Sequence, residues 1–361
     1  MRETPAVTLV LTNDHVAQLL TMRDVLEVLE YAYREMGRGR GVVRDRTHTF
    51  LPHPDPGREY EFKSMEGGLQ DPGVYALRIA SDVLEHPVVD GKRRRVKVPA
   101  LPGGRWLGLI LLFRIRDGAL LAILQDGLIQ GMRVAATSAL AARHLARPES
   151  RVMGLIGSGW QAKNHVLAMS AVFALAEVRV WSPTVANRER FAAEMTERAG
   201  VPVRAVDGPD EAVRGADLVC VATNSSEPVL KGRWLEPGQF VSSIVGGDER
   251  HRRRELDDEV LRRAHRVVVQ SRDHAQRIEQ EDLHTAVAAG YLRWQDVAEL
   301  AEVVAGRAPG RRSPGEITVF KNNVGLGIQF AAVAHLAYQR AVATNLGHTL
   351  PLEWFTQTIH P

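Results

Sequence analysis

Cysteine is nearly absent from this sequence. Cys220 is the one cysteine among 361 residues, so an internal disulfide is excluded. It stands within the apolar run ADLVCVAT, where a thiol behaves as a small hydrophobic group rather than as a nucleophile. Proteins without disulfides are typical of reducing compartments, and we therefore expect a cytoplasmic protein.

Long hydrophobic runs and an excess of one charge are also missing. No segment approaches the roughly 20 apolar residues needed to cross a bilayer, and the N-terminal residues lack the basic and apolar regions of a signal peptide. With 46 basic and 43 acidic residues the net charge is +3, which is too balanced for a nucleic-acid-binding surface. We expect a soluble protein with neither a membrane nor a nucleic acid as partner.

The thirteen histidines do not form a metal-binding pattern. No HxxxH pair and no Cys/His cluster with ligand spacing occurs, so we expect no metal site. Serine-hydrolase elbows and P-loops are missing in the same way, which excludes two common kinds of catalytic site. What remains is an ordinary globular composition, with 45% hydrophobic and 25% charged residues.

The chain changes its pattern near Met132. In residues 41–130, proline and glycine turns separate short strand-like runs, which is typical of β-rich structure with hairpins. From 132 to 317, apolar strands alternate with helices. That alternation predicts a parallel, doubly wound sheet.

A last apolar helix at 324–344 has too few partners of its own, so we expect it to pack on the β-rich part. The sequence therefore predicts an α/β protein with two domains. A Rossmann-type domain, residues 132–317, is inserted in a second α+β domain made of residues 1–131 and 318–361.

A glycine-rich loop is expected directly after the strand at 152–156. It consists of Gly157, Ser158, Gly159, Trp160 and Gln161. The first glycine permits a tight turn, and the second lets the backbone approach a pyrophosphate at the start of the following helix. Placed between a strand and a helix, this motif predicts a dinucleotide site, and a purely structural glycine turn is the alternative.

The end of the second strand bears on the choice of cofactor. An acid there would bind the ribose 2′-hydroxyl of NAD, but the sequence offers Ser182, Thr184 and Arg188 instead. Without a carboxylate, a 2′-phosphate meets no repulsion, and an arginine can pair with it. We expect NAD(P) as the cofactor, with NADP(H) slightly favoured.

Two further strand ends carry polar groups. Thr223, Asn224 and Ser225 follow the fourth strand, at the edge of the sheet where cofactor and substrate meet. Asp248 follows Gly246–Gly247 at the end of another strand. Turn formation and proton transfer are the two interpretations of this lone acid.

Together with the glycine loop, two quoted stretches carry a family resemblance, LQDGLIQGMRVAATSALAARHLA and ATNSSEPVLKGRWLEPGQFVSSIVGGD. With them the chain resembles the ornithine cyclodeaminase/μ-crystallin family over most of its length. The resemblance implies that the β-rich domain binds substrate and forms a homodimer. It also implies hydride transfer between a nicotinamide and the α-carbon of an amino acid or its imine.

The resemblance assigns roles to several residues. It places Asp248 on the family's catalytic aspartate and Arg133 on an arginine that binds the substrate carboxylate. Arg44 or Arg46 matches another carboxylate-binding arginine, and Arg46 is chosen by its distance to the segment KSM.

Departures from the family pattern bear on the substrate. Arg78 stands where the family has a carboxylate-binding lysine, and Lys63 stands where ornithine cyclodeaminases have an acid for the second ammonium. Phe330 replaces a common aspartate. Lys63 beside Arg78 and Arg133 favours a substrate with an additional anionic group, unless Glu61 or Glu66 substitutes for the missing acid.

We therefore expect an NAD(P)-dependent imine reductase or amino-acid dehydrogenase. Two alternatives stay open. One is a cyclodeaminase that forms a cyclic imino acid with recycled NAD, and the other is a non-catalytic nucleotide-binding protein of the μ-crystallin type.

Overall fold

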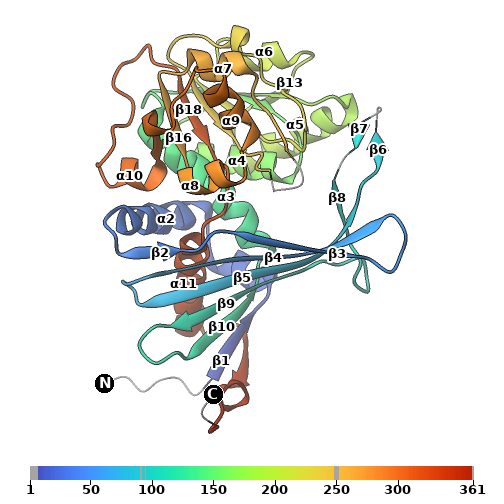
Figure 1. Cartoon of the computed structure of the whole chain (residues 1–361), viewed down its shortest axis with the longest axis vertical. Coiled ribbons are helices and arrows are strands. Elements are labelled where there is room, and N and C mark those ends of the chain that lie inside the picture. Colours follow the sequence, from blue (N-terminus) through green and yellow to red (C-terminus); the bar gives the residue numbers. More distant parts are fainter. Residues whose placement is uncertain (1–6, 90–91, 94, 248–251, 360–361) are drawn as a thin grey trace. The chain divides into compact units, whose positions relative to one another are not determined.

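The computed structural model describes residues 7–89, 92–93, 95–247 and 252–359. They form two compact units, each with its own sheet (Figure 1). The first unit contains the residues up to 21, 39–130 and those from 326 onward, and the second contains 22–38 and 131–325. The predicted α/β fold with an inserted Rossmann-type domain is confirmed.

A nine-stranded sheet forms the first unit, with the order β19-β1-β10-β9-β5-β4-β2, while β3 pairs with β4 and β8 with β5. The strands are β1 (Val7–Leu11), β2 (Gly41–Val43), β3 (Thr47–Pro52), β4 (Arg58–Leu69), β5 (Val74–Glu85), β8 (Val96–Val98), β9 (Leu107–Arg114), β10 (Leu120–Gln125) and β19 (His348–Pro351). The long strands β4 and β5 form a hairpin (Figure 1). Burial alternates along β5, so one face of the hairpin is covered and the other is partly open.

Two glycines allow helix α11 (Gly327–Thr344) to pack closely on this hairpin. A Cβ atom on Gly67 of β4 would lie 2.9 Å from the backbone nitrogen of Ile328. A Cβ atom on Gly327 would lie 1.9 Å from the carbonyl carbon of Glu66. Any side chain at either position would separate the helix from the sheet.

The short helix α1 (Asn13–Leu19) completes the unit, and β6 (Val88–Val89) and β7 (Lys92–Arg93) form a separate two-stranded ribbon.

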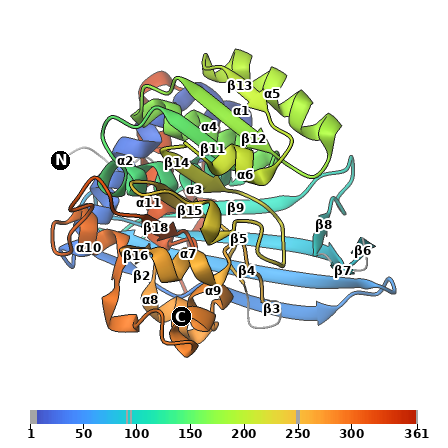
Figure 2. The same cartoon turned by 90° about the horizontal axis from the view of Figure 1, so that it is seen from above.

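The second unit contains an eight-stranded sheet in which every pairing is parallel, in the order β13-β12-β11-β14-β15-β18-β16-β17. Figure 2 shows this succession from β13 across to β16. The strands are β11 (Val152–Ile156), β12 (Glu177–Trp181), β13 (Val203–Ala205), β14 (Leu218–Val221), β15 (Phe240–Ser243), β16 (Arg266–Val269), β17 (Val297–Glu299) and β18 (Thr318–Lys321).

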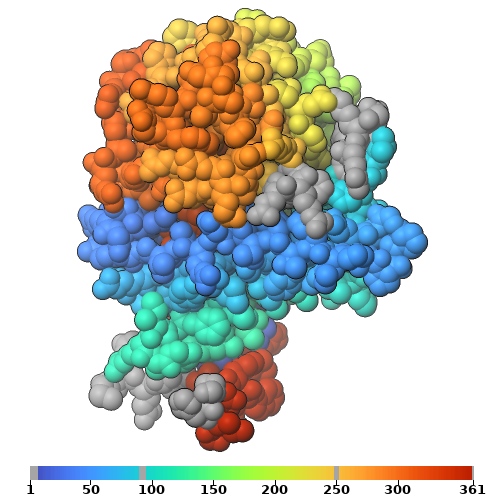
Figure 3. Space-filling model, viewed as in Figure 1, coloured from blue at the N-terminus to red at the C-terminus, as the bar shows by residue number. Residues whose placement is uncertain are grey.

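The helices of the second unit are α2 (Met22–Gly37), α3 (Gly127–Leu145, beginning in the first unit), α4 (Trp160–Val172), α5 (Val185–Ala199), α6 (Pro209–Val213), α7 (Asp258–Arg263), α8 (Arg272–Arg277), α9 (Glu281–Ala288) and α10 (Leu300–Val304). Most strands of the second unit are followed by a helix, and α2 and α3 precede its first strand, β11. The space-filling view shows the segment from α7 to α10, in orange, on one face of this unit (Figure 3). After β11 the chain forms β12 and β13 on one side and returns to β14 on the other. In folds with such a reversal, ligands bind at the carboxyl ends of the two strands on either side of it, which are β11 and β14 here.

The unit boundaries differ from the predicted ones at 131/132 and 317/318. Strand β18 pairs with β15 and β16, so residues 318–325 belong to the second unit. Helix α2 also belongs there and contacts α4 and α10. The sequence pattern did not place β18 in the second unit, because its four residues are all buried and are followed by a loop.

Two negative observations apply to the part of the chain that the structure describes. No helix there combines the length and apolar character that a membrane span requires. No group of three or more His, Cys, Asp or Glu side chains is placed to hold a metal ion.

Candidate functional site

The glycine loop has the geometry of a dinucleotide cradle. Gly157 has a φ of +116°, and a Cβ atom there would lie 2.2 Å from the carbonyl oxygen of Ala222. Gly159 is the N-cap of α4, and a Cβ atom on it would meet no atom within 4 Å. As the N-cap residue, Gly159 provides no side-chain hydrogen bond to α4, so the first backbone N–H groups of the helix are left for an anion. The loop is therefore tight at its first glycine and open at its second.

Trp160 and Gln161 place α4 against α3. The Trp160 ring packs over Gly131, where a Cβ atom would lie 2.5 Å from the ring, and half of this side chain is exposed. The carbonyl of Gln161 accepts a hydrogen bond from Nδ1 of His165 at 2.8 Å, and Nε2 of the same ring lies 3.0 Å from Ser138 Oγ. Burial lowers the pKa of His165 to about 4, so the ring is neutral.

The end of β12 is fastened to the loop. Ser158 Oγ donates a hydrogen bond to Ser182 Oγ at 2.9 Å. Arg188 is 7% exposed, and it donates to the Ser182 carbonyl at 3.1 Å and to Asp207 Oδ1 at 3.0 Å. Thr184 is the N-cap of α5 and makes no side-chain cap bond. Arg188, expected beside a 2′-phosphate, is thus already bonded within its own unit.

The polar loop after β14 is organised by a residue that the sequence analysis missed. The buried Glu255 accepts hydrogen bonds through Oε1 from the backbone N–H and the hydroxyl of Thr223, both at 2.8 Å. Thr223 Oγ1 in turn accepts from the backbone N–H of Ser225 at 3.1 Å. Asn224 lies between them at the same strand end.

The other oxygen of Glu255 fixes the end of β15. Oε2 accepts hydrogen bonds from Ser243 Oγ at 2.7 Å and from the backbone N–H groups of Ile244 and Val245 at 3.0 and 2.9 Å. This strand leads to Gly246–Gly247 and then to Asp248. Asp248 lies outside the described residues, so its predicted role stays a prediction.

A buried ion pair between Lys321 and Asp282 contacts the backbone of Glu255. Lys321 Nζ is 2.5 Å from Asp282 Oδ2 and 2.7 Å from Ser243 Oγ, and both charged side chains are fully buried. Asp282 Oδ1 accepts the backbone N–H of Glu255 at 3.2 Å. The signal in the sequence was a lone lysine at the end of the apolar run ITVFK.

In the first unit, Arg78 has a carboxylate partner. Its Nε and Nη2 atoms lie 2.7 and 2.5 Å from Asp126 Oδ2. A Cβ atom on Gly108 would lie 2.0 Å from Asp126 Oδ1, so a side chain there would displace the Asp126 carboxylate. The Phe330 ring centroid lies 5.9 Å from Cζ of Arg78, within the range of a cation–π contact. Phe330 therefore faces Arg78 with an apolar ring.

Lys63 belongs to a group of charges, which we call the Lys63 cluster: Glu61, Lys63, Asp82, Arg95 and Lys97. The first three are buried, Arg95 is partly buried and Lys97 is exposed. The Lys63 ammonium lies 2.8 Å from Glu61 Oε2 and 2.8 Å from Asp82 Oδ2. Arg95 pairs with Glu61, and Lys97 lies 2.7 Å from Asp82 Oδ2. The predicted anion-binding lysine is therefore paired with two carboxylates.

Burial and neighbouring charges set the protonation of this cluster. Burial and the charge of Lys97 lower the pKa of Lys63 to about 8. Burial alone would raise the pKa of Glu61, but the hydrogen bond with His48 at 2.7 Å and the charge of Lys63 hold it well below its ordinary value. Glu61 is therefore a carboxylate and not a proton donor near neutral pH.

The strand register places Lys63 and Arg78 on one face. Lys63 is opposite Ala80, and Met65 is opposite Arg78. Diagonal neighbours of this kind are about 7–8 Å apart. Two cations of the cluster come from the segment 86–106, because β8 pairs with β5. That segment thus contributes Arg95 and Lys97 to the cluster.

The two arginines of the segment VVRDR differ in their surroundings. The Arg44 side chain is 74% exposed and lies 3.8 Å from Glu66. Arg46 is half-buried, and its charge acts on His48. In the second unit, Arg133 on α3 is 3% exposed, and a Cβ atom on Gly325 would lie 2.7 Å from its Nη1.

The model of the Ornithine cyclodeaminase/mu-crystallin family matches residues 88–345. The chain belongs to this family. The resemblance noted in the sequence is thus confirmed, and other members show a range of named activities.

Three relatives illustrate that range. The Thermococcus litoralis Delta(1)-pyrroline-2-carboxylate reductase, solved with NADH and L-proline, has a TM-score of 0.81 and 31% identity over 95% of this chain and 100% of its own. An archaeal alanine dehydrogenase dimer with bound NAD has a TM-score of 0.79 and 28% identity over 95% and 99%. The ketimine reductase mu-crystallin of Mus musculus is 35% identical over 63% of this chain and 68% of its own.

Proposed function

We propose that this chain is an NAD(P)-dependent enzyme that transfers a hydride at the α-carbon of an amino acid or its imine, with imine reduction favoured. The observation that carries the proposal is the glycine loop of a family member, tight at Gly157 and open at Gly159. Relatives named pyrroline-2-carboxylate reductase and ketimine reductase support this reaction class.

The residues of the second unit fit a dinucleotide. The uncapped start of α4 offers N–H groups to a pyrophosphate, and Ser158, Ser182 and the Thr223–Ser225 loop line the carboxyl ends of the strands. When bound, the nicotinamide supplies or accepts the hydride. Since Arg188 is bonded to Ser182 and Asp207, its geometry gives no support for NADP over NAD.

We assign carboxylate binding to three arginines. Arg78 is oriented by Asp126, which accepts hydrogen bonds from Nε and Nη2 and so fixes its fork-shaped donor group. Arg133 is buried in the second unit, and half-buried Arg46 is preferred over exposed Arg44. Asp248 is assigned the proton that moves to or from the α-nitrogen while the hydride moves to or from the α-carbon.

The Lys63 cluster bears on the remainder of the substrate. Three cations and two carboxylates give the cluster a net charge of +1. We propose a substrate with one additional anionic or polar group at this end. Glu61 is already paired with Lys63 and Arg95, so it is a poor partner for the second ammonium of ornithine, and cyclodeamination is disfavoured.

A homodimer is also proposed, through the open face of the first sheet. Half-buried apolar side chains form a continuous stripe on neighbouring strands there: Tyr75, Leu77, Ile79, Leu109, Leu111 and Phe113. Contiguous apolar surface of this kind is typical of subunit interfaces, and the archaeal relative is described as a dimer.

The test is a substrate screen by absorbance of the nicotinamide. Purified protein is mixed with NADH or NADPH and with cyclic imino acids, or with keto acids plus ammonia. We expect turnover with at least one imine, and loss of turnover with retained cofactor affinity in Asp248→Asn. Cofactor binding without turnover across the panel would favour the non-catalytic alternative. Conversion of L-ornithine with recycled cofactor would contradict the interpretation of Lys63.

A further inference from the structure

An arginine-rich groove lies in the second unit, beside β16 and β17. It encloses about 710 Å³, within the range of small-molecule sites. Its charged lining comprises Arg266, Arg272, Arg293, Asp296, Glu302, Arg307 and Arg312. Five guanidinium groups therefore face two carboxylates, which leaves an excess of positive charge.

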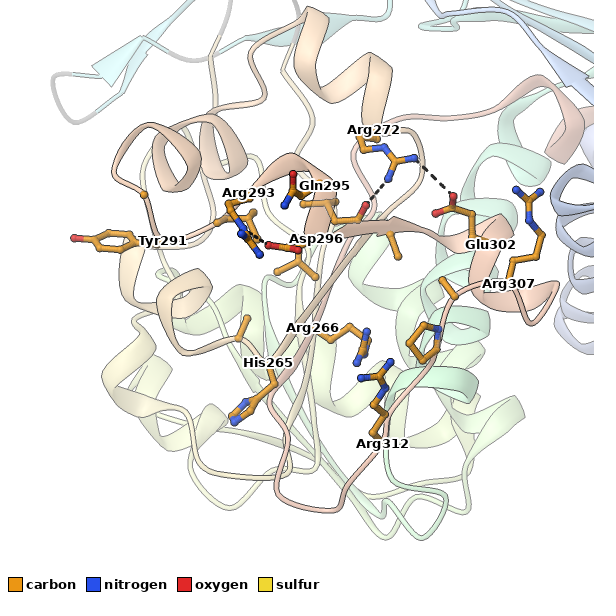
Figure 4. A pocket seen from close by; sticks show the side chains of 18 residues that line it. His265, Arg266, Arg272, Tyr291, Arg293, Gln295, Asp296, Glu302, Arg307 and Arg312 are labelled. Atoms are coloured by element: carbon orange, nitrogen blue, oxygen red, sulfur yellow. Dashed lines mark hydrogen bonds and ion pairs between the residues drawn. The ribbon is translucent and has the colours of Figure 1, made fainter.

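Three of the five arginines are already engaged. Arg272 donates a hydrogen bond to the carbonyl of Val297 at 2.8 Å, and its guanidinium lies 3.7 Å from the Glu302 carboxylate. Dashed lines mark both interactions in Figure 4. Arg293 pairs with Asp296 at 2.6 Å. Arg307 donates to the carbonyl of Gly37. These arginines shape the groove, and their charges are partly compensated.

Arg266 and Arg312 are different. Among the described residues, Nε of Arg266 is buried without a hydrogen-bond partner, and the exposed Arg312 side chain makes no hydrogen bond or ion pair. Both guanidinium groups point into the same part of the groove (Figure 4). Glu316, which accepts the backbone N–H of Arg312 at 2.8 Å, is the nearby acid that acts on Arg266.

We propose that this groove binds a phosphate-bearing anion at Arg266 and Arg312. Two like charges close together repel each other, and an anion bound between them relieves that repulsion. Guanidinium groups suit the oxygen geometry of a phosphate, and a buried N–H without a partner gains an acceptor when such an anion binds. The polar lining excludes a mainly apolar ligand.

The groove is distinct from the dinucleotide loop. Four strand spacings separate β11 from β16 in the order β11-β14-β15-β18-β16. At about 4.8 Å for each spacing, the two strands are about 19 Å apart. The site therefore belongs to a second ligand and is independent of the proposed activity.

The test uses inorganic pyrophosphate as the probe, by isothermal titration calorimetry at fixed ionic strength with saturating NADH. We expect saturable binding by the full chain, and a loss of at least about tenfold in Arg312→Gln and more in the Arg266→Gln/Arg312→Gln double variant. Arg312 is exposed, and among the described residues its side chain makes no hydrogen bond or ion pair, so its variant removes no such structural interaction.

The matched control is Arg198→Gln. Arg198 lies on α5, pairs with Glu194 at 2.8 Å and is half exposed, so its variant should bind pyrophosphate like the parent. Equal binding by all variants, or no saturable binding at millimolar concentration, would overturn the proposal. Tighter binding of citrate than of pyrophosphate would overturn the assignment to phosphate. If the glycine loop does not bind NADH, pyrophosphate is free to bind there instead. None of the substitutions lies in that loop, so such binding would be equal in all variants and is thereby distinguished from binding in the groove.

Discussion

At the scale of single residues, the meaning of a charge depends on its neighbours. Lys63 in isolation suggested an anion clamp, but it lies between Glu61 and Asp82. Arg188 suggested a 2′-phosphate site, but it is bonded to Ser182 and Asp207. In both cases the residue type was read correctly and its partners were not. Glu61 and Ser182 are only two and six positions away, whereas Asp82 and Asp207 are each 19 positions away, so sequence distance alone does not reveal which side chains pair.

His165 should make the second unit sensitive to acid. Its pKa is lowered by burial from 6.5 to about 4, so between these values the unfolded chain binds a proton that the folded chain does not. The stability from neutral His165 is complete above about pH 6.5 and is lost as the pH falls toward 4. The loss is about 3 kcal/mol. Denaturant unfolding measured across this range should show the decline.

The comparison that isolates this effect is His165→Gln. The variant should have a shallower decline below pH 6.5 than the parent chain. His348→Gln removes an exposed histidine and should leave the decline unchanged. Equal slopes for His165→Gln and the parent chain would contradict the interpretation.

At the scale of elements, Gly157 and Gly159 have different roles in the loop between β11 and α4. Gly157→Ala places a side chain in a left-handed conformation and against the carbonyl of Ala222, so we expect a loss of roughly 1–3 kcal/mol in stability. Gly159 has an extended backbone and open space, so Gly159→Ala should keep the stability and weaken NADH binding alone.

Thermal unfolding and titration of NADH fluorescence would separate these effects. If Gly159→Ala lowered the unfolding temperature as much as Gly157→Ala, the division of roles would be wrong. If NADH affinity were unchanged in Gly159→Ala, the loop would not approach the pyrophosphate as proposed.

Sequence patterns predicted elements better than partners. The strands VMGLI and LVCV were recognisable because their short length and the glycine beside each run distinguish them from buried helices. Strand β18 was assigned to the wrong side of the boundary, because its place in the sheet depends on pairing with β15 and β16. The Arg78–Asp126 pair joins residues 48 positions apart, and no local pattern reports such contacts.

At the scale of the whole molecule, the open face of the first sheet is where we expect self-association. Leu111→Arg places a charge in the apolar stripe opposite Leu77 and should shift the chain toward monomer in light scattering. Val185→Arg changes an exposed apolar residue on α5 and should leave the mass unaltered. A monomeric parent chain, or a dimer that survives Leu111→Arg, would refute this interface.

The carboxylate of Glu255 has a further consequence for the segment that contains Asp248. One end of that segment, Val245, donates its backbone N–H to Glu255, which is the other end. This hydrogen bond holds the two ends of the segment together. The entropy cost of bringing them together is therefore already included in the folding of the chain. The Asp248 carboxylate takes no part in the hydrogen bond between Val245 and Glu255, so Asp248→Asn removes neither partner of the contact that joins these two ends.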